Sequence, residues 1–360
     1  MPDHPLLAEL ARLTALNAPV GFEEPVLAYA REELSKACET VWQDVRGNLY
    51  AIQSGSDADA PNIMVTAHAD EIGFMVTHVR PDGFLRFTLL GFPTEQVLPG
   101  QRVTILADGR EIPGVIGVRP GHILKGDEAR RVPAAEERYI DIGAVSHAEA
   151  TEWGIEPGVP GVFHGPLTLT AHHDRIFGKA IDNRAGLLAV LEVARRLNDE
   201  QLPATRSYVV TVEEEIGLRG AFVAAGEIQP DVILAIDTVP AGGTPDVGPE
   251  QLPWQIGKGP LLKVRETQGL STHGPLRSLL RKVADHAEIP YQLIVDTAGI
   301  TDASTAQQAT GKAAAMVIGL ARRYSHSAIE MLDLGDLDGA ITLVEETVKR
   351  LTSREHLSRL

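Results

Sequence analysis

The chain has 360 residues, of which 44% are apolar and 23% charged, values ordinary for a globular enzyme long enough for two domains. Its formal net charge of −16 provides no basic surface for phosphates, so nucleic acid and anionic membranes are poor candidate partners. The sequence has no apolar stretch of about 20 residues, no N-terminal secretory pattern and only one cysteine, Cys38, which cannot form an internal disulfide. We therefore expect a cytoplasmic protein that acts on small molecules or peptides, with Cys38 as a packed thiol.

Apolar residues spaced three and four apart predict helices over residues 5–16 and 23–37. A short run rich in β-branched residues then predicts a strand over 62–67, after which the α/β rhythm pauses for about 100 residues. It resumes with a helix at 183–198, strands at 207–212 and 232–236, a helix at 275–287, strands near 291–295 and 314–319, and a helix at 336–351. Strands that alternate with helices predict an α/β fold with a doubly wound, mostly parallel sheet covered on both faces.

The segment from about 75 to 165 has a different pattern. Its apolar runs FLRFTLL, QRVTILAD, REIPGVIGV and RYIDIGAV are short, separated by glycine and proline, and show almost no helical period. We interpret it as a small all-β, barrel-like domain inserted into the α/β domain. The expected division assigns residues 1–72 and 166–360 to the α/β domain and 73–165 to the insert.

Polar residues that end apolar strands are the first candidates for a site, because sites in open α/β sheets form beyond the carboxyl ends of strands. His68 follows the strand in TAHADEIGF, and Asp70 lies on the same side if the chain stays extended. A carboxylate beside a histidine fixes the ring tautomer and raises its basicity as a metal ligand. A hydrogen-bonded surface pair is the alternative.

Three more strand ends or helix starts are acidic. Asp182 stands just before a helix in AIDNRAG, where an N-cap is the alternative function. Three glutamates end the run SYVVTV, and their mutual repulsion requires relief by solvent or by a cation. Glu214 and Glu215 can face one site only where this strand gives way to a turn. Asp237 ends the run VILAI, where a turn-forming role is the alternative.

His326 follows the apolar run AAAMVIGL, and a hydrogen-bonded histidine is its alternative function. Together the candidates have the charge to hold two divalent ions. Three carboxylates give three negative charges against the four positive charges of the ions, and one bound hydroxide would supply the balance. The set is His68, Asp182, Glu215, Asp237 and His326. Two ions about 3.5–4 Å apart need a shared ligand, for which we select Asp182. Mixed nitrogen and oxygen ligands favour zinc or cobalt over calcium or magnesium.

The motifs HADEIGFMV, AIDNRAG, EEEIGLRGA, AIDTVPAG and RYSHSAIE together resemble the M42 family of metallo-aminopeptidases, which includes glutamyl and deblocking aminopeptidases. The likeness covers nearly the whole chain in order. It implies a zinc-exopeptidase-like fold and a dinuclear metal site, whose ligands it divides between the two ions. The implied division is His68 and Asp237 on one metal, Glu215 and His326 on the other, and Asp182 bridging.

The same resemblance implies Glu214 as the general base and Asp70 as the partner that orients His68. The expected reaction removes N-terminal residues from short peptides, with Glu214 carrying the proton of an activated water to the departing amine. It further implies that the β insert forms dimer contacts and that six dimers assemble into a hollow tetrahedral dodecamer.

Several positions depart from the family pattern or stay unassigned. Glu213 stands where family members often have Gln, Gly243 where they often have Asp, and Ile300 replaces a glycine before the pair Thr301 and Asp302. We assign no role to Thr301, Asp302, His122 or the run His172, His173 and Asp174. The preferred N-terminal residue, the native metal and the choice between dimer and dodecamer also stay open.

Two other functions compete with the aminopeptidase. A glycoside hydrolase would use a pair of carboxylates and no metal, although 5% aromatic residues offer few surfaces on which sugars stack. A non-catalytic, metal-stabilised assembly protein would bind metal without turnover. The G-x-S-x-G, H-E-x-x-H, Walker and G-x-G-x-x-G motifs are absent from the sequence, so serine hydrolase, nucleotide-binding and dehydrogenase functions have no support.

Overall fold

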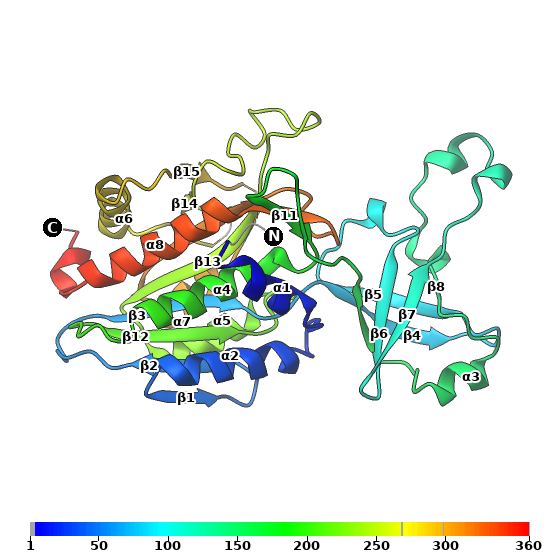
Figure 1. The fold of residues 1–360 in the computed structure, drawn as a ribbon, viewed down its shortest axis with the longest axis horizontal. Helices are drawn as coiled ribbons and strands as arrows, with labels where there is room; N and C mark the ends of the chain where they lie inside the picture. The colour runs from blue at the N-terminus through cyan, green and yellow to red at the C-terminus, as the bar shows by residue number, and fades with distance from the viewer. Residues whose placement is uncertain (1–3, 268, 298, 360) are drawn as a thin grey trace.

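A large mixed sheet forms the body of the molecule, and a closed β-barrel projects from one end of it (Figure 1). The computed structural model describes residues 4–267, 269–297 and 299–359. The sheet has eight strands in the order β1–β2–β12–β3–β13–β16–β14–β15. Their bounds are β1 (Thr40–Gln43), β2 (Leu49–Gln53), β12 (Thr205–Thr211), β3 (Asn62–His68), β13 (Val232–Pro240), β16 (Ala314–Arg322), β14 (Leu261–Arg265) and β15 (Gln292–Val295).

The central strands β12, β3, β13 and β16 are parallel, so their carboxyl ends meet at one edge of the sheet. Towards the two edges, β2 pairs antiparallel with β1 and β12, and β14 pairs antiparallel with β16. The expectation of an α/β fold is therefore confirmed. The sheet is mixed, because β14 and β15 also pair in parallel while β1–β2, β2–β12 and β14–β16 are antiparallel. The short connection over residues 44–48 makes β1 and β2 antiparallel, because only antiparallel strands can be joined by so few residues.

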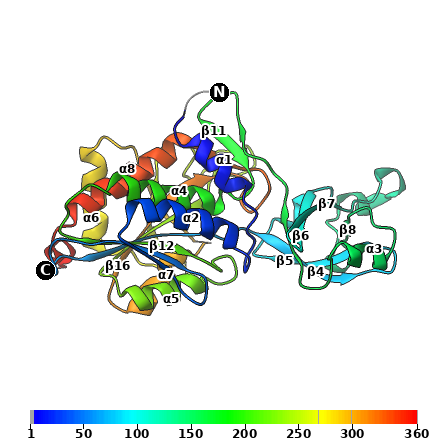
Figure 2. The same cartoon turned by 60° about the horizontal axis from the view of Figure 1, so that its bottom comes forward.

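Helices cover both faces of the sheet (Figure 2). One face carries α1 (Leu7–Ala15), α2 (Glu24–Ala37), α4 (Ile181–Arg196), α6 (Gly274–His286) and α8 (Leu334–Arg350). The other carries α5 (Arg219–Ile228) and α7 (Asp302–Thr310), which pack against each other. Helix α4 is buried on nearly all sides, between the sheet and its neighbouring helices, as its continuous apolar run requires.

The predicted helices and strands of the α/β body each correspond to an observed element, with ends that differ by a few residues. Helices α5 and α7 and strands β1, β2 and β14 are not among the predictions. Helix α7 has the sequence DASTAQQAT, which has no strong apolar stripe, and β14 includes the buried charged residue Lys263. Both elements form through tertiary packing that overrides their weak local pattern.

The barrel closes in the order β4–β5–β8–β7–β6–β9 and has a hydrophobic core of its own. Its strands are β4 (Gly73–Val79), β5 (Leu85–Leu90), β6 (Arg102–Ala107), β7 (Arg110–Ile116), β8 (Ile140–Asp141) and β9 (Pro160–Phe163). A small sheet of β10 (Thr168–Leu169), β11 (Arg175–Gly178) and β17 (Glu330–Asp333) lies in the α/β body. The exact domain limits, 72/73 and 165/166, stay a prediction.

The expectation of a barrel-like insert is confirmed by the closed barrel, although the insert is not purely β, because it also contains the short helix α3 (His147–Glu152). The Ser146 side chain caps this helix by accepting a hydrogen bond from the Glu149 N–H at 3.2 Å, while the Glu149 side chain accepts from the Val145 N–H. A six-residue helix is too short to display a helical period. Single 3₁₀ turns occur at η1 (Glu95–Val97), η2 (Gly121–Ile123), η3 (Gly126–Arg130), η4 (Ala135–Glu137) and, near the C-terminus, η5 (Arg354–Leu357).

Within the described ranges, none of the helices is both long and apolar enough to cross a membrane.

Candidate metal centre

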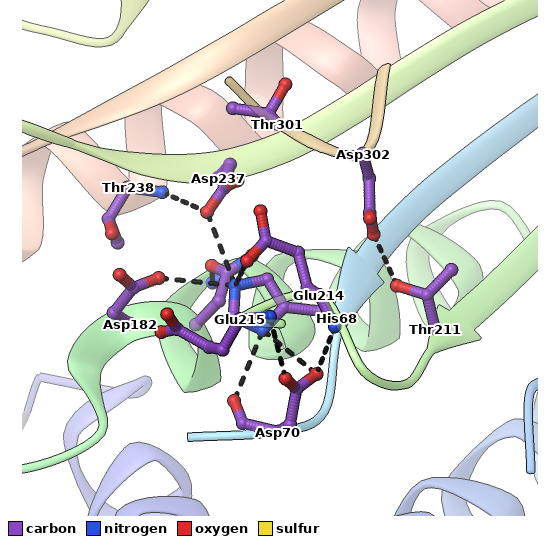
Figure 3. Close-up of polar contacts among 12 residues, drawn as sticks. His68, Asp70, Asp182, Thr211, Glu214, Glu215, Asp237, Thr238, Thr301 and Asp302 are labelled. Atoms are coloured by element: carbon purple, nitrogen blue, oxygen red, sulfur yellow. Dashed lines mark hydrogen bonds and ion pairs between the residues drawn. The ribbon is translucent and has the colours of Figure 1, made fainter. Parts of the chain in front are cut away.

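The predicted residues converge at the carboxyl ends of the central strands, beside the point where the chain leaves β3 for the barrel. Figure 3 labels all of them except His326. His68 is the last residue of β3, and Asp237 lies in β13. Glu214 and Glu215 lie in the turn that follows β12, where Glu213 has a φ of 56°. Asp182 lies at the start of α4, and His326 follows β16.

His68 faces three carboxylates. Its Nε2 lies 3.3 Å from Asp182 Oδ1, 3.7 Å from Asp237 Oδ1 and 4.0 Å from Glu214 Oε2. The parallel register pairs Thr211 with His68, so the turn after β12 begins beside the imidazole. The sheet itself therefore brings these groups together.

His326 faces the opposite side of the same aspartate. Its Nε2 lies 3.4 Å from Asp182 Oδ2 and 3.6 Å from Glu215 Oε2. The Asp182 carboxylate thus points one oxygen at each histidine, which is the geometry that a bridging carboxylate requires. Its Oδ1 has no hydrogen-bond partner and its Oδ2 accepts from Arg322, while Asn183 Oδ1 accepts the Gly186 N–H in the first turn of α4, so the N-cap alternative has no support in the geometry.

Buried oxygens of this site lack the hydrogen bonds that such atoms normally have. Asp182 Oδ1 and Glu215 Oε1 are both buried without a hydrogen-bond partner, an arrangement that costs free energy unless a cation is bound. Candidate ligand atoms lie within 4.8 Å of one another in two groups. They are His68 with Glu214 and Asp237, and His68 with Asp182 and Glu215. This set of nitrogen and oxygen donors fits ions such as zinc or cobalt.

The crowding of carboxylates changes their protonation. Burial, with Asp237 and Glu215 nearby, raises the pKa of Glu214 well above its usual value. Burial and the Asp182 charge raise the pKa of Glu215 to about 8. Burial alone would lower the pKa of His326, but its contacts with Asp182 and Glu215 outweigh burial and raise that pKa to about 9. The site therefore concentrates negative charge that a bound cation would stabilise.

Asp70 connects His68, at the end of β3, with the acidic turn that follows β12. Its Oδ1 lies 3.4 Å from His68 Nδ1, and its two oxygens accept the N–H groups of Glu214 at 3.1 Å and Glu215 at 3.0 Å. Asp70 and His68 are both buried, so they are not an exposed surface pair. One carboxylate thereby orients the imidazole and the acidic turn at once.

A buried ion network lies behind this strand end, and the sequence analysis missed it. Glu71 accepts hydrogen bonds from Lys179 Nζ at 2.8 Å and from Arg184 Nη2 at 3.2 Å. The Arg184 guanidinium also donates to the carbonyl of Ala69, between His68 and Asp70. The network fixes the segment that carries these two site residues.

Two further residues contact the predicted ligands and were also missed. Arg322, the last residue of β16, donates from Nη1 to Asp182 Oδ2 and to Glu330 Oε1. Glu330 in turn accepts the Asp182 N–H at 2.9 Å and the His326 N–H at 3.0 Å. The only signal for them was their place in the run ARRYSHSAIE around His326.

The insert also contributes to the site. His326 Nδ1 lies 2.9 Å from the carbonyl oxygen of Phe92, and the Thr94 N–H donates to the His326 carbonyl at 2.9 Å. A ring nitrogen fixed by a carbonyl leaves the other nitrogen, Nε2, free to bind a metal.

The unassigned residues divide into two groups. Thr301 and Asp302 are buried beside the site, where Asp302 accepts a hydrogen bond from Thr211 (Figure 3). Burial raises the pKa of Asp302 to about 7. The run 172–174 is exposed, and His122 is exposed on the insert, so neither joins the cluster.

Cys38, just after α2, packs against the main hydrophobic core. Burial raises the pKa of its thiol to about 12, so it is uncharged at neutral pH.

Comparisons with known proteins identify the family of this chain. Residues 47–343 match the family described as M42 glutamyl aminopeptidase. The chain is 32% identical over 354 residues to glutamyl aminopeptidase of Lactococcus lactis, covering 97% of this chain and 98% of that one. It also superposes on an aminopeptidase from the archaeon Desulfurococcus kamchatkensis with a TM-score of 0.92, 36% identity and coverage of 98% and 96% of the two chains. The Pyrococcus horikoshii TET1 peptidase, whose structure is described as assembling into a tetrahedron or a large octahedral shell, matches with a TM-score of 0.84, 28% identity and coverage of 95% and 98%.

Proposed function

The chain belongs to the M42 glutamyl aminopeptidase family, and from this premise we propose that it removes N-terminal residues from short peptides at a dinuclear metal site. The observation that carries the proposal is the position of Asp182, whose two carboxylate oxygens face two different histidines. In this proposal His68 and Asp237 hold one ion, Glu215 and His326 hold the other, and Asp182 binds both. Zinc and cobalt suit these ligands best.

The chemistry divides between the ions and the chain. When bound, two divalent ions would supply Lewis acidity for the attacking water and the scissile carbonyl. Glu214 would hold the proton of that water and pass it to the nitrogen of the departing amine. Its Oε2 lies 4.0 Å from His68 Nε2, so the carboxylate is within reach of a water at the proposed ion between His68 and Asp237.

Burial raises the pKa of Glu214 above its usual value, and a raised pKa makes this carboxylate a stronger proton acceptor for the water. Asp70 would keep His68 oriented with its Nε2 towards the ions.

We also propose assembly through the β insert into dimers and a dodecamer, by analogy with the shell described for the P. horikoshii peptidase. A hollow shell would admit short, unfolded peptides and exclude folded proteins. The cytoplasm is the proposed location, because the lone, uncharged thiol of Cys38 suits a reducing compartment.

Hydrolysis of aminoacyl p-nitroanilides tests the function. We would assay the Leu, Glu and Lys substrates with wild type and Glu214→Gln, after EDTA treatment and after zinc or cobalt is restored. Wild type should lose activity with EDTA and regain it with metal, while Glu214→Gln should bind metal normally and lose about 10²–10⁴-fold in kcat. Glu213→Gln is the matched control, because the Glu213 carboxylate pairs with Arg46 outside the cluster. It should keep full activity.

The same experiment separates the alternatives. Activity that survives both EDTA and Glu214→Gln would contradict the metal mechanism, and hydrolysis of a β-glucan under those conditions would favour the glycoside hydrolase. Bound metal without turnover of any peptide substrate would favour the assembly protein.

A further inference from the structure

The two oxygens of Asp182 have unequal surroundings. Oδ1, which faces His68, is buried and accepts no hydrogen bond. Oδ2, which faces His326, accepts a charged hydrogen bond from Arg322 Nη1. The lone pairs that would bind an ion are therefore free on one side of the carboxylate and shared with a guanidinium on the other.

Arg322 is a permanent cation at this position. Its side chain is almost fully buried at the end of β16, where Nη2 donates to Ser325 Oγ at 2.8 Å. A guanidinium does not lose its proton in proteins, so its charge stays next to Asp182 at every working pH. A like charge so close to a bound divalent ion is repulsive in a buried site.

Glu330 opposes that charge. Its Oε1 accepts from Arg322, and its carboxylate also accepts the backbone N–H groups of Asp182 and His326. The hydrogen bond from Arg322 Nη1 to Glu330 Oε1 weakens the interaction of the guanidinium with Asp182 Oδ2. The pair is nearly neutral as a whole, but its positive end lies against the aspartate.

We propose that Arg322 makes the two metal positions unequal, by weakening ion binding between Glu215 and His326 through Asp182 Oδ2, and that Glu330 limits this weakening. The inference rests on the dinuclear site proposed above. Arg322 and Glu330 are positioning residues in this scheme, since both act through Asp182. The ion between His68 and Asp237 binds first, and the ion beside His326 exchanges more readily.

Calorimetric titration of Zn²⁺ or Co²⁺ into the metal-free full chain tests the inference without any assay of turnover. Wild type should show a tight and a weak binding step. Arg322→Met should tighten the weak step by about 10- to 100-fold, because Asp182 Oδ2 becomes free. Glu330→Gln should weaken the same step further, because a neutral amide competes less than a carboxylate for the guanidinium that bonds Asp182. The absorption spectrum of bound Co²⁺ would assign which step belongs to which position.

Arg323→Met is the matched control, one residue along the chain. The Arg323 guanidinium donates to the Gly243 carbonyl at 2.9 Å and has no contact with Asp182, so both steps should match wild type. If Arg322→Met does not fold because Glu330 loses its partner, the double variant Arg322→Met/Glu330→Gln replaces it. The double variant should bind the second ion at least about 10-fold more tightly than the single variant Glu330→Gln does.

The two single variants should change the affinity for the second ion in opposite directions, which makes the inference easy to overturn. If Arg322→Met weakens the second step as Glu330→Gln does, Arg322 merely holds Asp182 in place. Two equal steps in wild type would also overturn it, while leaving the dinuclear function intact. A wild type that binds no ion at all would remove both proposals, and the chelator experiment above would show the same failure independently.

Discussion

The two histidines of the site are held in different ways. His68 ends a central strand, and its side chain is 2% exposed, enclosed by the sheet and by Asp70. His326 lies in a loop after β16 with a φ of 54°, and its side chain is 25% exposed. Contacts from the insert and from Glu330 hold that loop. One half of the site is thus built by regular secondary structure. The other is a loop held by the nearby Glu330 and by the Phe92 carbonyl of the insert.

Substituting alanine for each histidine should have the largest effect and should distinguish the two halves of the site. His68→Ala and His326→Ala should each lower kcat/KM by about 10³-fold or more, because several kcal/mol of transition-state stabilisation depend on the ions. The metal-free proteins should differ. His68→Ala leaves the buried Asp70 carboxylate without its imidazole and opens a cavity, and should cost about 2–4 kcal/mol in the free energy of unfolding.

Urea unfolding in the presence of EDTA measures that difference without any contribution from metal. His326→Ala should unfold at nearly the wild-type urea concentration, because its side chain is partly exposed. Equal destabilisation by the two variants would contradict the view that only His68 is part of the rigid sheet.

Asp70→Asn should have the next largest effect. The substitution keeps the shape but removes the charge that faces His68 Nδ1, and should weaken ion binding at the His68 position by about 10- to 100-fold. Calorimetric titration should show this loss in one binding step. Equal weakening of both steps would mean that Asp70 acts mainly through the N–H groups of Glu214 and Glu215.

Thr94→Ala should have the smallest effect and is confined to the His326 side. It removes the hydrogen bond from Thr94 Oγ1 to the Ser325 carbonyl at 3.1 Å and leaves the Thr94 N–H contact with His326 in place. Losing this hydrogen bond should cost about 1 kcal/mol or less, which corresponds to at most about fivefold weaker binding of the second ion.

Thr88→Ala on the exposed side of β5 is the control for Thr94→Ala and should leave both binding steps unchanged. If Thr94→Ala weakens ion binding at the His68 position instead, the insert does not influence the site through the Thr94 contact with Ser325.

The candidate ligands were predictable because each ends or follows an apolar run, or begins a helix. Parallel central strands bring their carboxyl ends to one edge, so residues distant in sequence, such as His68 and Asp237, meet there without any further information. The turn at Glu214 and Glu215 was predictable for a similar reason, because adjacent strand residues point in opposite directions. Strands β1, β2 and β14 and helix α7 were not predicted, since their short or weakly patterned sequences depend on neighbours for stability.

The sequence by itself determined the α/β class, the interruption by a β-rich insert and the residue types at the candidate site, because periodicity and strand-end chemistry are local properties. Only the tertiary structure decided which oxygen of Asp182 faces which histidine, that Arg322 and Glu330 lie against that carboxylate, and that the Phe92 carbonyl orients His326. Those contacts join segments separated by 140 and 234 residues, and no local pattern encodes a distance between such segments.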